Sequence, residues 1–260
     1  MINAKISIIT VCLNCEGLIE RTIKSVIDQT YTNIQYIVID GGSTDNTLDI
    51  IKKYENKIDI VLSEKDGGIY DAMNKGIKIA TGDLVYFLNS GDFLFNESVL
   101  KNVIHNLDQN DDCDILYGDW VYYGGNGTKF NSGYRWDKYE IMWRGINHQA
   151  VFTRRSVFEE DGYFDKKYKI CADYDWLLRS LLKYKRKIRY INSPIVYYLW
   201  GGKSMSAGNN YIYEKYNIRN KYLSLGDHLL LTVSYPIVVG EYVRNISARV
   251  LGYSAINSRP

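Results

Sequence analysis

Several side chains able to bind a ligand stand at the ends of apolar, β-branched segments of the chain. Asn14, Asp40, Asp66 and Asp92 each end or follow one of four such segments. Carboxylates there can accept hydrogen bonds from a base or a ribose, and one of them can bind a divalent cation that also binds a diphosphate. Mg²⁺ and Mn²⁺ prefer oxygen ligands and keep several waters, so one or two protein carboxylates suffice. The residues therefore predict a site for a nucleotide and a metal.

A second pair of carboxylates, Asp173 and Asp175, stands at the start of the helix-like segment 172–184. Residues two apart on a helix point to roughly opposite faces, so one carboxylate can face a cleft while the other caps the helix or faces solvent. A carboxylate in a cleft is a candidate general base for a hydroxyl group. The alternative is that both residues stabilise the helix N-terminus through its dipole.

The elements that would position these side chains follow from the spacing of apolar residues. Strand-like and helix-like segments alternate through the first 90 or so residues, which is typical of a doubly wound parallel sheet. Ligands of such sheets bind beyond the carboxyl ends of the strands, where the four residues named first fall. The predicted strands are 5–13, 34–40, 58–64 and 83–88, and helices are predicted within 17–31, 43–54 and 66–81.

Beyond residue 95 the pattern is less regular. The segment 124–136 is rich in Gly and Asn and predicts an exposed hairpin. The other predicted elements are a helix at 98–107, a strand at 114–123, a strand and the start of a helix at 148–158, a helix at 172–184, and two strands within 187–200.

The composition is that of an ordinary globular protein. The 260 residues include 32 basic and 30 acidic side chains, which gives no reason to expect nucleic acid as an electrostatic partner. Four cysteines form no disulfide framework in so long a chain, and Cys12 and Cys15 are either a redox C-x-x-C pair or two small packing residues. The N-terminus has no signal pattern, so we expect a cytoplasmic protein.

The longest apolar stretch, 228–243, is interrupted by Pro236 and Gly240 and is too short to span a bilayer. Arg244 and Arg249 lie beyond it. Such a tail is expected to lie on a membrane surface, to pack on the protein or to form a homodimer interface.

Four sequence blocks resemble the inverting family-2 glycosyltransferases of the GT-A fold, of the bacterial cell-surface polysaccharide type. The blocks SIITVCLN, YIVIDGGSTDNT, DAMNKGI and ATGDLVYFLNSGD occur in order within residues 5–92, and a second patch covers 147–182. A P-loop and a G-x-G-x-x-G turn are both missing after the first strand. The resemblance implies an α/β fold with a GT-A type nucleotide-binding sheet, mostly parallel with flanking helices, plus an acceptor-side region and a C-terminal helical tail.

The resemblance also implies where the donor and its metal bind. The family's D-x-D-type motif matches residues 89–92, in which only Asp92 is a carboxylate and would ligate Mn²⁺ or Mg²⁺. The family's second strand usually ends Asp-Asp-Gly-Ser, whereas this chain has Asp40 followed by Gly41, so Asp66 or Glu64 is expected to supply the missing carboxylate. From local sequence alone, a helix cap or turn is the alternative for Asp92, and a turn carboxylate is the alternative for Asp40. The implied donor-binding residues are Val11, Leu13, Asn14, Asp40, Gly41, Asp66, Asn74, Lys75, Asn89, Ser90, Gly91, Lys203 and Ser204.

On the acceptor side, the family's Glu-Asp motif maps onto Ala172-Asp173, which makes Asp173 the implied catalytic base. His148, Asp175 and Trp176 are implied acceptor-binding residues, although a lone histidine in an apolar strand is often structural. The loop around Lys203 resembles one that closes on the diphosphate in this family, and a solvated loop is the alternative.

These inferences predict an inverting, metal-dependent hexosyltransferase that uses a nucleotide-sugar donor, with UDP-hexose expected. The expected acceptor is a lipid-diphosphate-linked saccharide in O-antigen or capsule synthesis at the inner face of the cytoplasmic membrane. Residues 1–105 would form the nucleotide-sugar half, 106–225 the acceptor and catalytic-base half, and 226–260 an amphipathic tail. A nucleotidyltransferase and a non-catalytic sugar-nucleotide binder are the alternatives.

Overall fold

The first strand is apolar on both faces, and this determines the layered arrangement of the N-terminal half. Ile6 and Ile8 pack in one buried cluster, while Ile9 and Val11 pack in another on the opposite side of the sheet. Successive side chains of a strand point to opposite faces, so a strand buried on both sides must be covered by helices on both sides. The computed structural model describes residues 3–107, 113–124, 129–131, 138–201, 208–224 and 226–227.

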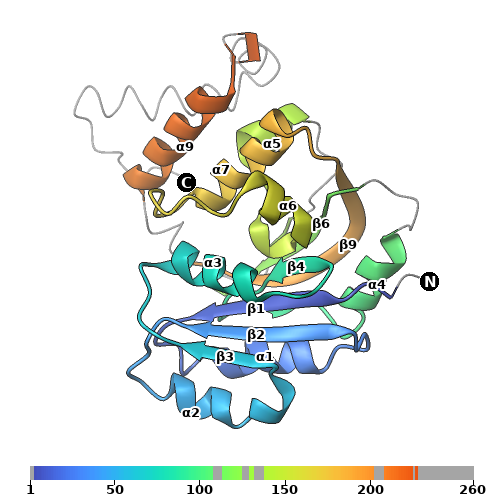
Figure 1. The fold of residues 1–260 in the computed structure, drawn as a ribbon, viewed down its shortest axis with the longest axis vertical. Helices are drawn as coiled ribbons and strands as arrows, with labels where there is room; N and C mark the ends of the chain where they lie inside the picture. Colours follow the sequence, from blue (N-terminus) through green and yellow to red (C-terminus); the bar gives the residue numbers. More distant parts are fainter. Residues whose placement is uncertain are drawn as a thin grey trace, which may run out of the picture. The chain divides into compact units, whose positions relative to one another are not determined.

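Four parallel strands form the N-terminal half of the sheet in the order β3-β2-β1-β4 (Figure 1). Their bounds are β1 Ile6–Cys12, β2 Ile34–Asp40, β3 Ile60–Ser63 and β4 Leu84–Phe87. Each lies within a predicted strand. Because β4 lies beside β1 and not beside β3, the chain order reverses next to β1, which is the usual ligand-binding position of such sheets.

Helices cover both faces of this half. One cluster contains the apolar faces of α1 and α4, through Ile23 and Val103, and the opposite cluster contains those of α3, α6 and α7, through Met73, Phe158 and Trp176. The helix bounds are α1 Ile19–Ile27, α2 Thr47–Lys52, α3 Ile69–Ile79, α4 Val99–Asn106, α5 Lys138–Arg144, α6 Arg155–Asp161 and α7 Ala172–Leu178. Short 3₁₀ helices occupy Glu55–Lys57 and His148–Ala150, and a π-helical turn occupies Arg179–Lys183.

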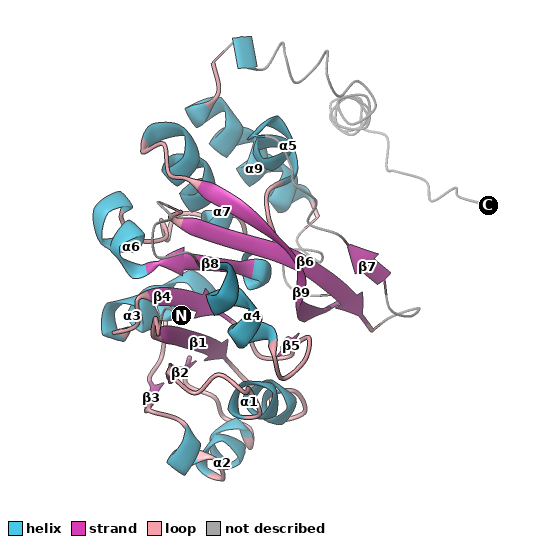
Figure 2. Ribbon diagram, turned by 90° about the vertical axis from the view of Figure 1, so that its right-hand side faces the viewer, coloured by secondary structure: helices cyan, strands magenta, loops and turns pink. Residues whose placement is uncertain are grey.

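The sheet continues from β4 with mixed pairing, which Figure 2 shows from the side. β8 pairs antiparallel with both β4 and β6, β9 runs parallel to β6, and β5 and β7 pair antiparallel with β9 and β6. The bounds are β5 Phe93–Leu94, β6 Ile115–Tyr123, β7 Lys129–Asn131, β8 Val151–Arg154 and β9 Ile188–Leu199. The predicted α/β class with flanking helices is confirmed, and its parallel pairing is concentrated in the N-terminal half.

One predicted boundary is wrong. Residues 187–200 were expected to form two strands, but β9 is a single strand that contains Pro194. Proline cannot donate to a sheet, and the β6–β9 register shifts on both sides of Asp119, the residue opposite Pro194. The extra, unpaired residues at these shifts belong to β9, so bulges in β9 let the strand pass the proline without a break.

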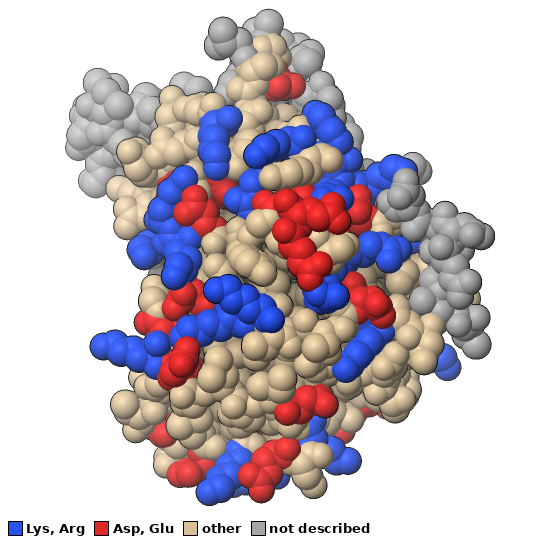
Figure 3. Space-filling model, in the orientation of Figure 1, with Lys and Arg blue, Asp and Glu red and all other residues tan. Residues whose placement is uncertain are grey.

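Residues 1–218 form one compact unit and residues 219–260 a second. Helix α9, Asn209–Tyr222, begins in the first unit. Most of the predicted amphipathic tail lies outside the described residues, and the division into donor and acceptor halves stays a prediction. Of the described helices, none combines the length and the hydropathy needed to cross a bilayer. Acidic and basic side chains are interspersed over the face shown in Figure 3.

Candidate active site

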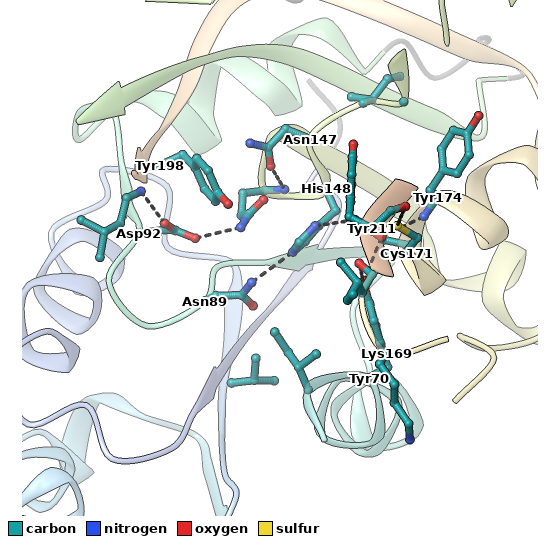
Figure 4. A pocket seen from close by; sticks show the side chains of 18 of the residues that line it. Tyr70, Asn89, Asp92, Asn147, His148, Lys169, Cys171, Tyr174, Tyr198 and Tyr211 are labelled. Carbon is teal, nitrogen blue, oxygen red and sulfur yellow. Dashed lines mark hydrogen bonds and ion pairs between the residues drawn. The ribbon is translucent and has the colours of Figure 1, made fainter. Parts of the chain in front are cut away.

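A pocket of about 1290 Å³ opens at the carboxyl ends of β1 and β4. Its lining comes from the end of β1, the loop after β4, the starts of α3 and α7, the turn His148–Ala150, and residues of α5 and α9, together with aromatic residues of β6 and β9. Figure 4 shows part of this lining. Small-molecule sites are commonly 300–1,000 Å³. The volume is therefore sufficient for two substrates together.

Asp92 lines this pocket and is buried to 3% exposure. Its Oδ1 accepts a hydrogen bond from the backbone N–H of Leu199 at 2.9 Å, and its Oδ2 accepts one from Nε2 of Gln149 at 3.0 Å. Burial raises the pKa of Asp92 to about 7, although both hydrogen bonds and the charge of His148 work in the opposite direction. A carboxylate in this position is stabilised by a cation.

The donor atoms around Asp92 fit a hard divalent cation. Both carboxylate oxygens retain lone pairs beyond the hydrogen bonds they accept, and the hydroxyl of Ser90 lines the same pocket. Among the described residues, His, Cys, Asp and Glu do not form a cluster of three that would hold a metal unaided. An oxygen donor set this small suits Mg²⁺ or Mn²⁺ only when phosphate oxygens and waters complete the coordination.

Asp173, at the start of α7, lies in the same pocket and has a different environment. Its Oδ2 lies 2.8 Å from Nδ1 of His148, and its Oδ1 accepts hydrogen bonds from the hydroxyl of Tyr70 and from the backbone N–H of Tyr174, each at 2.9 Å. Burial acts to raise the pKa, but the contact with His148, its charge and the Tyr70 hydroxyl outweigh it. The pKa of Asp173 is therefore below its ordinary value of 3.8. This carboxylate is ionised at neutral pH.

A two-residue segment links these carboxylates. His148 contacts Asp173 through Nδ1 and Asn89 through Nε2, the latter at 3.0 Å, while the adjacent Gln149 donates to Asp92 (Figure 4). The sequence reasoning included His148 but missed Gln149 and Tyr70. A glutamine next to a candidate histidine was the available signal for Gln149. Tyr70 offered none, because tyrosine is abundant in this chain.

Asp40 ends β2 and is fully buried. Its carboxylate accepts hydrogen bonds from the backbone N–H groups of Gly42 and Ser43 and from the hydroxyls of Ser43 and Ser63. Burial acts to raise the pKa of Asp40, but these hydrogen bonds lower it overall. The structure thus places this side chain in its own turn, which is the alternative that local sequence left open.

Asp66 is the acidic residue that faces the pocket beside this turn. A Cβ atom on Gly41 would overlap Oδ2 of Asp66 and lie 3.1 Å from its Cγ, so the carboxylate packs directly over the Gly41 backbone. Glu64, the other expected substitute, forms a salt bridge with Lys75 at 2.7 Å. Asp66 is therefore the better placed of the two to contact a nucleotide.

The remaining predicted donor residues divide into two groups. Val11, Leu13, Asn89 and Ser90 line the pocket. The other group makes structural contacts: Asn14 has φ +48° and accepts from the backbone of Thr44, Asn74 exchanges hydrogen bonds with the backbone of Phe164, Lys75 pairs with Glu64, and Gly91 has φ +98° beside Leu199. Lys203 and Ser204 lie outside the described residues.

Two predicted acceptor residues are in the core. Asp175 is fully buried and lies 3.5 Å from Arg179, and Trp176 is 4% exposed and stacks on Phe158. Neither lines the pocket, so the structure gives no acceptor contact through these side chains. The helix turns Asp173 toward the pocket and Asp175 away from it. Cys12 and Cys15 are both free thiols, and both are buried.

Comparison with known proteins identifies relatives. The family model described as "Glycosyl transferase family 2" matches residues 7–179. A PGL/p-HBAD biosynthesis glycosyltransferase of Mycobacterium tuberculosis is 32% identical over 196 residues, which are 74% of this chain and 75% of that protein. A cholesterol galactosyltransferase of Borreliella burgdorferi is 27% identical over 221 residues, 82% of this chain and 60% of that protein.

Solved structures share the fold. The structure of S. aureus TarS 1–349 in complex with UDP-GlcNAc superposes with a TM-score of 0.69 at 24% identity, covering 82% of this chain and 64% of that one. The mannosyltransferase PcManGT from Pyrobaculum calidifontis, in complex with GDP-Man and Mn²⁺, gives 0.66 at 13% identity, with coverage of 96% and 76%. The chain spans only 36% of the longer S. aureus TarS chain.

Proposed function

Because the chain belongs to glycosyl transferase family 2, we propose that it moves a hexose, with inversion, from a UDP-sugar to a hydroxyl group of a saccharide acceptor. The observation that carries the proposal is that two carboxylates of opposite character, Asp92 and Asp173, line one pocket at the carboxyl ends of parallel strands. Asp92 is buried, and among the described residues no cationic side chain hydrogen-bonds to it. Asp173 is held ionised by its neighbours. A metal–diphosphate site beside a general base is the chemistry that such a pair supports.

The donor is proposed to lie along the ends of β1 and β4. Asp66, above Gly41, is placed to accept from the base or ribose, and Leu13, which is 48% exposed, offers apolar surface to the base. Asp92 would hold a divalent cation together with the diphosphate. When bound, that cation neutralises the charge that develops on the leaving diphosphate.

The chemical step is a single displacement. The acceptor oxygen bonds to the anomeric carbon as the bond from that carbon to the diphosphate oxygen breaks, and UDP leaves. Asp173 takes the hydroxyl proton on Oδ2, because Oδ1 already accepts from Tyr70 and Tyr174 and Oδ2 has a lone pair left after His148. Attack from the face opposite the diphosphate inverts the anomeric configuration and gives a β-linkage from an α-linked donor.

The acceptor is proposed to be a lipid-diphosphate-linked saccharide at the inner face of the cytoplasmic membrane, in surface polysaccharide synthesis. Relatives named for PGL/p-HBAD biosynthesis and for cholesterol galactosylation support a glycosyltransferase that works on lipid-bearing acceptors. The apolar, basic-flanked sequence of 228–253 supports peripheral membrane association.

The test is UDP release from a panel of UDP-glucose, UDP-galactose and UDP-N-acetylglucosamine, with GDP-mannose as a comparison donor, in Mn²⁺ or Mg²⁺. A polyprenyl-diphosphate-linked N-acetylglucosamine serves as the acceptor. We expect acceptor-dependent UDP release that stops on chelation. Release of pyrophosphate would instead indicate a nucleotidyltransferase, and donor binding with no turnover of any donor would indicate a binding protein.

Asp173→Asn separates the two carboxylate roles. The amide is nearly isosteric but cannot accept the proton, so turnover should fall by several orders of magnitude while UDP affinity stays within a factor of about three. A large loss of UDP affinity in this variant would contradict the assignment of Asp173 as the base. Asp92→Ala should instead weaken the metal-dependent binding of UDP.

A further inference from the structure

A chain of side-chain hydrogen bonds runs from the loop after β4 to the proposed base. Asn89 Nδ2 lies 3.0 Å from Nε2 of His148, and Nδ1 of His148 lies 2.8 Å from Oδ2 of Asp173 (Figure 4). These residues come from the loop after β4, from the turn His148–Ala150 and from α7. Fold packing alone gives no reason for three polar groups from separate elements to be aligned inside a pocket.

The direction of the chain follows from which groups can donate. The ionised Asp173 carboxylate can only accept, so Nδ1 of His148 carries the ring proton that faces it. In a neutral imidazole Nε2 then has a lone pair, and the Asn89 amide 3.0 Å away can donate to it. Asn89 is therefore placed to support the tautomer in which His148 donates to the carboxylate.

Asn89 differs from an acidic residue in a way that matters here. Its Oδ1 is buried and accepts no hydrogen bond from any residue that the structure describes. A carboxylate at this position could only accept hydrogen bonds. It would favour a proton on Nε2 of His148, either in place of the proton on Nδ1 or in addition to it. The amide is compatible with a neutral imidazole that donates to Asp173.

We propose that His148, oriented by Asn89, is the positioning residue of the base: its Nδ1–H holds the Asp173 carboxylate in place for proton transfer. This rests on the proposed function, in which Asp173 deprotonates the acceptor. His148 acts through Asp173 and is not itself the group that takes the proton. The arrangement follows the general logic of a base oriented by a third group.

The neighbours of Asp173 determine the direction in which a substitution of His148 should move the pKa of this carboxylate. The described titratable groups that hydrogen-bond it are His148, from the turn, and Tyr70, from α3. The same pocket is also lined by other titratable groups. The acidic ones are Asp66, Asp92 and Glu140, the basic ones are Arg144, Lys169 and Lys215, and the remaining ones are Cys12, Cys171, Tyr122, Tyr174, Tyr198 and Tyr211. His148 lowers the pKa of Asp173, so removing its Nδ1–H should raise that pKa and move the acid limb of the pH profile to higher pH.

Two substitutions of similar polarity separate the two ring nitrogens. In His148→Asn the amide nitrogen can occupy the place of Nδ1, whereas in His148→Gln it reaches the place of Nε2. We expect His148→Gln to shift the acid limb of kcat/KM upward by about one pH unit and to lower kcat about 10- to 100-fold. We expect His148→Asn to keep most of the activity and to shift the limb less. His105→Gln, on the exposed side of α4, is the matched control and should change neither quantity.

The kinetics are measured as UDP release with the donor and acceptor pair that turns over, at saturating Mn²⁺, from pH 3 to 9, so that the range includes the acid limb of the unchanged chain. If the acid limb of the kcat/KM profile lies at the same pH for His148→Asn, His148→Gln and the unchanged chain, the inference is overturned. The assignment of Asp173 as the base would be unaffected by that result. If Asp173→Asn retains turnover, the proposed base is wrong and the inference falls with it. UDP affinity and thermal melting show whether each variant is folded.

A readout without turnover keeps the test independent of the donor. The chain has three histidines, so ¹⁵N–¹H correlation of the imidazole nitrogens, with His148→Asn for assignment, identifies the His148 signal. We expect the Nδ1–H tautomer near pH 8, and a change of that signal in Asp173→Asn. An Nε2–H tautomer for His148 would overturn the inference.

Discussion

The backbone of Gly41 lies directly beneath the carboxylate of Asp66, so close that a Cβ on Gly41 would overlap Oδ2. The two residues follow different strands, and their contact brings an acid to the end of β2 although the residue after Asp40 there is a glycine. Asp66 therefore puts a carboxylate beside the end of β2, where the chain itself has a glycine.

Gly41→Ala should weaken UDP binding by displacing Asp66. The added methyl group and the carboxylate cannot occupy the same space, so Asp66 must move away from the place where it would meet the nucleotide. Isothermal titration with UDP and Mn²⁺ measures the change, for which we expect a loss of about 10-fold, near 1.4 kcal/mol. In an Asp66→Ala background the same substitution should cost much less, and a full additive loss there would show that the two residues act independently.

Asp92→Asn should stabilise the metal-free protein at high pH while weakening its binding of UDP with Mn²⁺. The pKa of Asp92 is raised from 3.8 to about 7, so the folded state binds more protons than the unfolded state between these values. Stability therefore falls as the pH rises through this window, by as much as about 4 kcal/mol in total. An amide does not ionise, so urea unfolding at pH 8 should favour the variant, and at pH 4 the advantage should vanish. A variant less stable than the unchanged chain at pH 8 would contradict the raised pKa.

Tyr70→Phe should lower turnover with little effect on UDP affinity. The Tyr70 hydroxyl lies 2.6 Å from the backbone oxygen of Ile170 and 2.9 Å from Oδ1 of Asp173, but it has a single proton. It can donate to Oδ1 of the ionised carboxylate, and it can turn to Ile170 once Asp173 holds the acceptor's proton on Oδ2. Hydrogen bonds to charged groups contribute about 1.5–3 kcal/mol, so we expect kcat to fall roughly 10- to 100-fold. An unchanged kcat would show that this contact is only structural.

Asp175→Ala should destabilise the fold without changing the KM for the acceptor. Asp175 is fully buried beside Arg179, and removing one partner of a buried ion pair typically costs about 3–5 kcal/mol. Urea unfolding gives the free energy of unfolding, and acceptor kinetics below the melting temperature give KM. A raised KM with unchanged stability would restore the acceptor-binding role that the sequence implied.

The sequence predicted the parallel half of the sheet well because strands buried on both faces read as continuous apolar runs. It also located Asp92 and Asp173, which follow such a run and begin a helix. It could not show that Asp40 bonds its own turn or that Asp175 is buried, because both depend on which way a side chain points once the helices have packed. Gln149 and Tyr70 join the site only through contacts that span 57 and 103 residues, respectively. Local patterns contain no information about such distant partners.

The hydrogen bond from the Leu199 backbone to Asp92 joins residues 107 positions apart. During synthesis the N-terminal strands leave the ribosome first, and domains tend to fold in that order. A nascent chain that ends before β9 would have β1 to β4 available but would lack both the N–H group that Asp92 accepts from and the strand that pairs with β5. The site therefore requires β9, so a translation product truncated before it would keep the strand ends of a nucleotide site without the finished carboxylate pocket.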